Sequence, residues 1–202
     1  MTTDISICNS ALVLIGGTDN AINSFDDDTR EARVCAQLYP NTKDYTISRH
    51  PWKFSLAQQA LAQLAAKPLF DYDKAYQLPT DPKIIQAIKI SDGVGSVLNF
   101  GLSGRVTQSY RILEDMLFTN ATQINLLFQF SPEEATFPPY FTEVLEFAMS
   151  EKLALALEQD ESLADRMAVR LDQRARKARH IDSRNDPPFS FPREELVLAS
   201  VR

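Results

Sequence analysis

The chain has 202 residues, enough for one domain with a substantial core or for one domain that carries a sizeable insertion. Hydrophobic residues make up 44% and charged residues 24%, an ordinary globular composition that argues against disorder. The net charge of −6 disfavours non-specific binding of DNA over the whole surface, because phosphate neutralisation needs clustered Lys and Arg. A channel through which DNA slides remains compatible with this charge.

The sequence predicts neither a targeting segment nor a cofactor. No basic stretch precedes an apolar run at the N-terminus, so we expect no signal peptide. No stretch approaches about 18 uninterrupted apolar residues, so we expect no membrane span. Cys8 and Cys35 fall on apolar helix faces and are predicted to be buried thiols, with a disulfide possible if their helices pack side by side. His50 and His180 lie far apart without partner cysteines, so we expect no metal and no other cofactor.

Two helices are predicted in the first fifty residues. The first begins at Asp4 as N-cap and ends at Gly16 and Gly17, and its buried face comprises Ile5, Cys8, Leu12 and Ile15. The second begins at Asp28, which forms a capping-box-like pattern with Glu31, and it buries Ala32, Cys35, Ala36 and Tyr39. Because Pro40 falls inside this second pattern, we expect a kink or a break there.

The middle of the chain predicts strands. Residues 55–66 are ambiguous between helix and strand, whereas the isoleucine-rich segment 83–90 and the pair Glu114-Asp115 indicate a strand and a hairpin turn. The clearest alternation is that of Ile124, Leu126, Phe128 and Phe130. Short segments at close spacing favour an antiparallel meander over parallel crossover units.

Two further helices and an apolar tail complete the chain. The inward face of the first of these helices is predicted as Phe141, Val144, Leu145, Ala148, Met149, Leu153, Leu155 and Leu157, and that of the second as Leu163, Met167, Leu171, Ala175 and Ala178. Residues 186–188 then end regular structure. The tail is more apolar than a segment left in water should be, so we expect it to dock on another molecule through Phe189, Phe191, Leu196, Val197, Leu198, Val201 and Arg202.

A basic stripe follows the final helix. Its members recur at spacings of three to four residues: Arg166, Arg170, Arg174 and Lys177. One interpretation is a solvated helix face whose cations suit the C-terminal end of the helix dipole. The other is a docking surface for an acidic partner or for DNA.

Catalysis has little support in the sequence. Acidic residues adjoin at 26–28, 133–134 and 194–195, but glycosidases need two carboxylates opposed across a cleft in different environments. We therefore interpret these acids as a helix cap and solvated loops. No phosphate-binding glycine loop is present in the sequence, and we expect no enzyme.

Two segments are typical of fixed structural joints. Pro51 disfavours helical geometry at His50, so the second helix should end there and bury Trp52 and Phe54 at the junction. Further on, Tyr76 and Leu78 alternate with polar residues before a turn at Pro79.

These segments resemble the tail tubular protein A family, the head-to-tail adaptors of short-tailed bacteriophages. The resemblance runs over roughly residues 5–178. Its most specific parts are His50-Pro-Trp-Lys-Phe54 and Ala75-Tyr-Gln-Leu-Pro79 with Asp81. It extends to segments 8–16, 32–39, 110–119, 124–130, 139–141 and 153–155. Pro40 departs from the family pattern.

The resemblance implies an α+β protein, a helical bundle with an inserted antiparallel β-sheet region and an extended C-terminal tail. We place the bundle at residues 1–75 and 131–183, the β region at 76–130 and a portal-docking tail at 184–202. The resemblance further implies a twelve-copy ring that is made in the host cytoplasm and lies at the head-to-tail junction of the virion. Its expected partners are the portal protein, the tail tube or nozzle protein and double-stranded DNA passing through the lumen, with no membrane.

Two other functions stay open at this point. Some relatives are credited with glycan hydrolysis, so a particle-associated, carboxylate-dependent hydrolase of glycan or cell wall is the alternative. A DNA-packaging accessory that grips duplex DNA with the basic stripe is the second.

Overall fold

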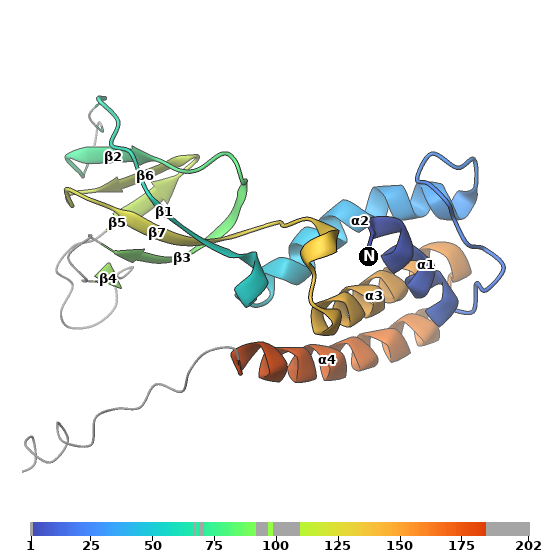
Figure 1. Ribbon diagram of the computed structural model, residues 1–202. Coiled ribbons are helices and arrows are strands. Elements are labelled where there is room, and N and C mark those ends of the chain that lie inside the picture. Colours follow the sequence, from blue (N-terminus) through green and yellow to red (C-terminus); the bar gives the residue numbers. More distant parts are fainter. Residues whose placement is uncertain (1, 67, 69–70, 92–96, 99–109, 185–202) are drawn as a thin grey trace, which may run out of the picture.

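The computed structural model describes residues 2–66, 68, 71–91, 97–98 and 110–184, and these form an α+β protein (Figure 1). A helical bundle occupies one side and an antiparallel β region the other, as the expected architecture requires. The tail beyond residue 184 lies outside the described residues.

The bundle is built around one helix. Helix α3 (Pro139–Leu153) packs against α1 (Asp4–Leu14), α2 (Arg30–Ser48) and α4 (Glu161–Ser183). The predicted inward face of α4 is confirmed at four of its residues, which are buried: Met167, Leu171, Ala175 and Ala178. No described helix is long and apolar enough to span a membrane.

Two details of the first helices differ from the sequence prediction. The N-caps are Thr3 and Thr29, whose hydroxyls accept the backbone N–H groups of Ser6 and Ala32 at 3.1 Å. Each predicted cap, Asp4 or Asp28, lies next to the true one, and both Thr and Asp are among the residues that favour the N-cap position. Helix α2 continues through Pro40 without a break.

Both cysteines are buried free thiols, as predicted. Cys8 lies on α1 and Cys35 on α2, and they belong to the same apolar core. The hydrogen bond with Cys35, together with burial, raises the pKa of the Cys8 thiol.

A π-helical turn, Ala154–Glu158 (η3), connects α3 to α4. Its hydrogen bonds run from i to i+5, so its side chains depart from the 3.6-residue pattern of the preceding helix. Gln159 closes the turn in the left-handed region at φ 54°. Leu155, predicted to face inward, is therefore 49% exposed.

The β region has two antiparallel sheets. One has the order β1-β7-β3-β4, from β1 (Leu56–Ala60), β7 (Asn125–Phe130), β3 (Ile84–Ser91) and β4 (Val97–Leu98). The other has the order β2-β6-β5, from β2 (Lys74–Gln77), β6 (Met116–Thr119) and β5 (Tyr110–Leu113). The hairpin at Glu114-Asp115 and the strand that ends at Phe130 are confirmed.

The predicted meander is wrong, although its antiparallel character is right. Strand β7 pairs with β1 and β3, and β6 pairs with β2, so distant segments form most of the ladders. The first strand begins at Leu56, so the β region starts earlier than the boundary expected at residue 76. The two sheets share one apolar core that includes Tyr76, Leu117 and Phe128.

Replacement of Pro40 tests how much this proline destabilises helix α2. Proline inside a helix removes a hydrogen bond and costs about 3 kcal/mol. Because Pro40 is exposed in a continuous helix, we expect Pro40→Ala to raise the unfolding free energy by about 1–3 kcal/mol in urea titrations. The matched variant Asn41→Ala should change it by only about 0.5 kcal/mol. Destabilisation by Pro40→Ala would show that the native packing requires proline there.

Candidate functional site: the joint and helix α4

The chain passes between bundle and β region at two places, and an aromatic cluster lies where they meet. Trp52, from the outgoing segment, packs its ring 5.3 Å from that of Phe141 at an interplanar angle of 68°. Phe54 lies 4.7 Å from Phe141 and 5.6 Å from Phe137, on the returning segment. Trp52 is 2% exposed and Phe141 fully buried. The predicted aromatic plug at Trp52 and Phe54 thus joins both crossings.

The end of α2 is closed by side chains from the joint. The last carbonyls of a helix lack intrahelical donors and need other partners when buried. Trp52 Nε1 donates to the carbonyl of Thr46 at 3.3 Å. Gln129 Nε2, from β7, lies 2.8 Å from the Ile47 carbonyl and 2.7 Å from that of His50. Strand β7 is thereby hydrogen-bonded to the helical bundle.

A buried carboxylate ties the end of α4 to the same joint. Asp182, fully buried, accepts the Tyr140 hydroxyl at 2.7 Å and the Lys53 backbone N–H at 3.2 Å, and lies 3.6 Å from His50 Nε2. Burial raises the pKa of Tyr140, and its bond to Asp182 raises it further. Burial lowers the pKa of His50 despite the opposing attraction of Asp182. Through these contacts, the Asp182 carboxylate holds the end of α4 against the joint.

Of the adjoining acids at 133–134, Glu134 has a structural role. Glu134 accepts Lys43 Nζ at 2.8 Å and the Tyr39 hydroxyl at 3.1 Å, which fixes the returning segment to α2. Burial of Glu134 works to raise its pKa, but the hydrogen bonds from Lys43, Tyr39 and the backbone, together with the charge of Lys43, lower it.

The six predicted joint residues separate into two groups. Pro51, Trp52 and Phe54 lie at the junction, with Pro51 exposed. The group Tyr76, Leu78 and Pro79 lies within the β region instead. The Tyr76 hydroxyl donates to the Ala121 carbonyl at 2.7 Å, and the Leu78 N–H donates to the carbonyl of Asp115.

The basic stripe is not uniform. Arg166, Arg170 and Lys177 are exposed, and Arg166 donates to Ser162 Oγ at 3.1 Å. Arg174 is half-buried, pairs with Glu143 at 3.1 Å and lies 5.7 Å above the Phe147 ring. Arg174 therefore connects α4 to α3, whereas the other three members of the stripe are exposed.

Arg170 and Arg174 border an open groove of about 780 Å³ between α1, α3 and α4. Glu143 and Glu146 line it from α3. Burial raises the pKa of Glu146, although a hydrogen bond with Ser10 opposes the shift. Two carboxylates in different environments thus share one groove. No group of three His, Cys, Asp or Glu residues suited to a metal ion occurs in the described part of the chain.

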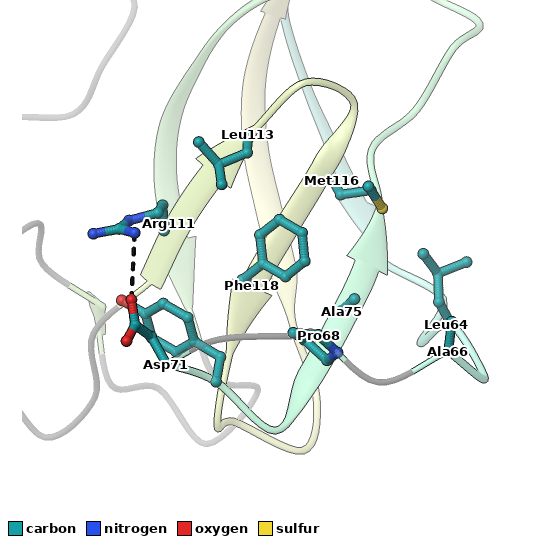
Figure 2. Close-up of a pocket in the computed structure, with 10 residues that line it drawn as sticks. Leu64, Ala66, Pro68, Asp71, Ala75, Arg111, Leu113, Met116 and Phe118 are labelled. Carbon is teal, nitrogen blue, oxygen red and sulfur yellow. Dashed lines mark hydrogen bonds and ion pairs between the residues drawn. The ribbon is translucent and has the colours of Figure 1, made fainter.

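A second, apolar pocket of about 360 Å³ lies in the β region (Figure 2). Leu113 lines it from β5, and Met116 and Phe118 line it from β6. The close-up shows Arg111 paired with Asp71 at its edge, and the two side chains are 3.4 Å apart. Because its charged groups pair with each other, this pocket suits an apolar group better than acid–base chemistry.

Sequence reasoning missed Gln129, Tyr140 and Asp182. Gln129 falls between Phe128 and Phe130, so the alternation of the strand places its side chain on the face opposite to theirs. That face was expected to be exposed to solvent, but it contacts the helical bundle. Asp182 continues the helical spacing of the buried residues Ala175 and Ala178. This spacing was the one sequence signal that could have predicted its burial. The predicted docking residues from Phe189 to Arg202 lie outside the described residues.

Removal of the Gln129 amide tests the joint. We expect Gln129→Leu to lower the unfolding free energy by about 1–3 kcal/mol, because buried carbonyls of α2 lose their donor. Chemical denaturation followed by far-UV circular dichroism would measure this. Gln58→Leu, on the exposed face of β1, is the matched control and should have little effect. Equal stability of Gln129→Leu and wild type would contradict the assigned role.

Comparison with models of known protein families gave no match to this chain, and comparison with curated proteins gave none either.

Proposed function

We propose that the chain is a structural virion protein, a head-to-tail adaptor that assembles as a ring between the portal and the tail tube or nozzle. Double-stranded DNA passes through the ring without sequence-specific contacts. The protein itself performs no catalysis in this role. The proposal rests on the resemblance described above together with the architecture of the joint.

The structure of the joint is the main support for this proposal. The segment that is most specific to the resemblance, His50 to Phe54, lies where the bundle meets the β region, with Trp52 at its buried centre. Aromatic packing and the anchors Gln129 and Asp182 then hold the two parts in one arrangement. A connector that bridges two different partners benefits from such a fixed geometry between its two ends.

The tail supplies the proposed contact with the portal. It has apolar residues from Phe189 to Val201, and α4, from which it continues, is anchored to the joint through Asp182. Burial of these side chains against many identical portal subunits would add up over the ring, because each copy contributes the same contact.

One observation favours the hydrolase as a second candidate. Glu146, with its raised pKa, and Glu143 line the same groove, the kind of pairing that acid–base hydrolysis uses. Their position on one helix and the Glu143–Arg174 ion pair favour a packing role.

Deletion of residues 192–202 tests the adaptor proposal. We expect the shortened chain to fold and to lose attachment to portal-bearing heads, because most of the apolar docking segment is gone. Co-sedimentation with purified heads would measure attachment, and circular dichroism would verify folding. Completion of particles by the shortened chain would contradict the tail assignment.

A turnover assay separates the hydrolase from the adaptor. For the adaptor we expect no release of reducing sugar from cell-wall or capsular glycan by the purified chain. Activity that is lost in Glu146→Gln but retained in Glu133→Gln, an exposed acid outside the groove, would favour the hydrolase.

A further inference from the structure

The two cysteines of the chain lie together in the core of the bundle. Cys8 is on α1 and Cys35 on α2, and both side chains are fully buried. A hydrogen bond joins the two thiols, so their sulfur atoms meet between the two helices. Because the sequence has only these two cysteines, the chain has a single possible intramolecular disulfide.

Packing alone does not require sulfur at these two positions. The same core contains the small side chains of Ala11 on α1 and Ala32 on α2, which are also fully buried. The joint closes the opposite end of α2, and neither cysteine lines the groove between α1, α3 and α4. The paired thiols therefore have a chemical property that the packing and the joint leave unused.

The hydrogen bond makes the two thiols chemically unequal. This bond and burial raise the pKa of Cys8, whereas the same bond lowers the pKa of Cys35 against the opposing effects of burial and Glu31. The thiolate is the nucleophile in thiol–disulfide exchange, so Cys35 is the better attacking group. Cys8 lies beside it, where a second thiol can resolve the mixed disulfide that Cys35 forms.

Access to the buried pair depends on helix α1. This helix has 11 residues, packs mainly against α3 and touches α2 over a smaller area. The segment that follows it, up to Arg30, has no helix or strand. Elements with few contacts open locally at a fraction of the free energy of global unfolding. Movement of α1 away from α2 therefore exposes both thiols while the rest of the bundle stays folded.

We propose that Cys8 and Cys35 form a reversible cross-link, in which oxidation ties α1 to α2 through a disulfide and reduction releases it. The oxidant is a low-molecular-weight disulfide of the glutathione class. The Cys35 thiolate attacks one sulfur of this disulfide and expels the first small thiolate. The Cys8 thiolate then attacks Cys35 Sγ and expels the second. Two electrons pass to the small disulfide, and the two protons that the cysteines lose complete its two thiols.

The cross-link stabilises the bundle through the unfolded chain. It joins residues 8 and 35 and so closes a loop that includes the irregular segment before Arg30. Closing such a loop lowers the conformational entropy of the unfolded chain, which favours the folded state. The folded chain needs little rearrangement, because the two sulfurs already meet and have only to approach to a bond length of about 2 Å.

The proposed function gives the cross-link a time of action, and this timing alone rests on that function. A virion protein is made in a reducing cytoplasm, where thiols persist, and is later released from the cell, where disulfides persist. The reduced pair leaves α1 able to move during assembly. The oxidised pair then fixes α1 to α2 in the released particle.

Oxidation of the purified, folded chain by oxidised glutathione tests the cross-link. Intact mass shows whether the chain loses two hydrogen atoms or retains glutathione. Peptide mapping without reductant shows whether Cys8 and Cys35 are linked. Thermal unfolding of the oxidised and reduced chains, followed by circular dichroism, measures the change in stability.

Three variants serve as controls. Cys8→Ala and Cys35→Ala each retain one thiol. The matched control, Cys8→Ala with Asn41→Cys, keeps two cysteines but places both on α2. About 9 Å of helix then separates them, which is too far for a disulfide within one chain.

We expect the folded wild type to lose two hydrogen atoms without retaining glutathione, and its unfolding midpoint to rise by about 5–10 °C. Dithiothreitol should restore the original mass and midpoint. The Cys8→Ala variant should stop at a mixed disulfide on Cys35, and the matched control should form no link within the chain.

Three results would overturn the proposal: a folded wild type that keeps both thiols, oxidation that occurs only in urea, or a disulfide that lowers the unfolding midpoint. Failure of head attachment by a chain that still forms the disulfide would refute the adaptor function and leave the cross-link standing.

Discussion

The structure depends on how helix α2 ends. A helix that stops inside a protein leaves buried carbonyl groups, and here their donors come from elsewhere in the chain: Trp52 Nε1 from the crossing segment and Gln129 Nε2 from a central strand. Because the strand provides the closing donor, separating the β region from the bundle would expose unsatisfied carbonyls. Asp182 extends this dependence to the end of α4. The bundle and the β region are therefore energetically one unit.

The π turn between α3 and α4 has the opposite consequence, since it directs apolar surface outward. A regular helix would continue the inward face through Leu155, and the bundle would close on itself. The turn instead leaves Leu155 exposed to solvent at that end of the bundle.

Much of this fold was predictable from the sequence, because helix and strand faces follow local periodicity. Most of the predicted inward residues of α1, α3 and α4, the free thiols and the β5–β6 hairpin were found in this way. The failures have non-local causes. Gln129 is buried by a helix more than seventy residues earlier in the chain, and the ladders of β7 and β6 join distant strands. Leu155 is exposed by a turn type that leaves no mark in the hydrophobic pattern. The joint residues Trp52 and Phe54 were identified correctly, whereas Asp182 and Tyr140, which complete the joint, were not.

The mass of the full-length chain in solution, alone and together with its portal protein, tests the account most directly. The account predicts a closed assembly whose mass is a fixed multiple of the single chain, and twelve copies in the complex with the portal. A chain that keeps the mass of one copy under both conditions, at every concentration at which it stays soluble, would contradict it.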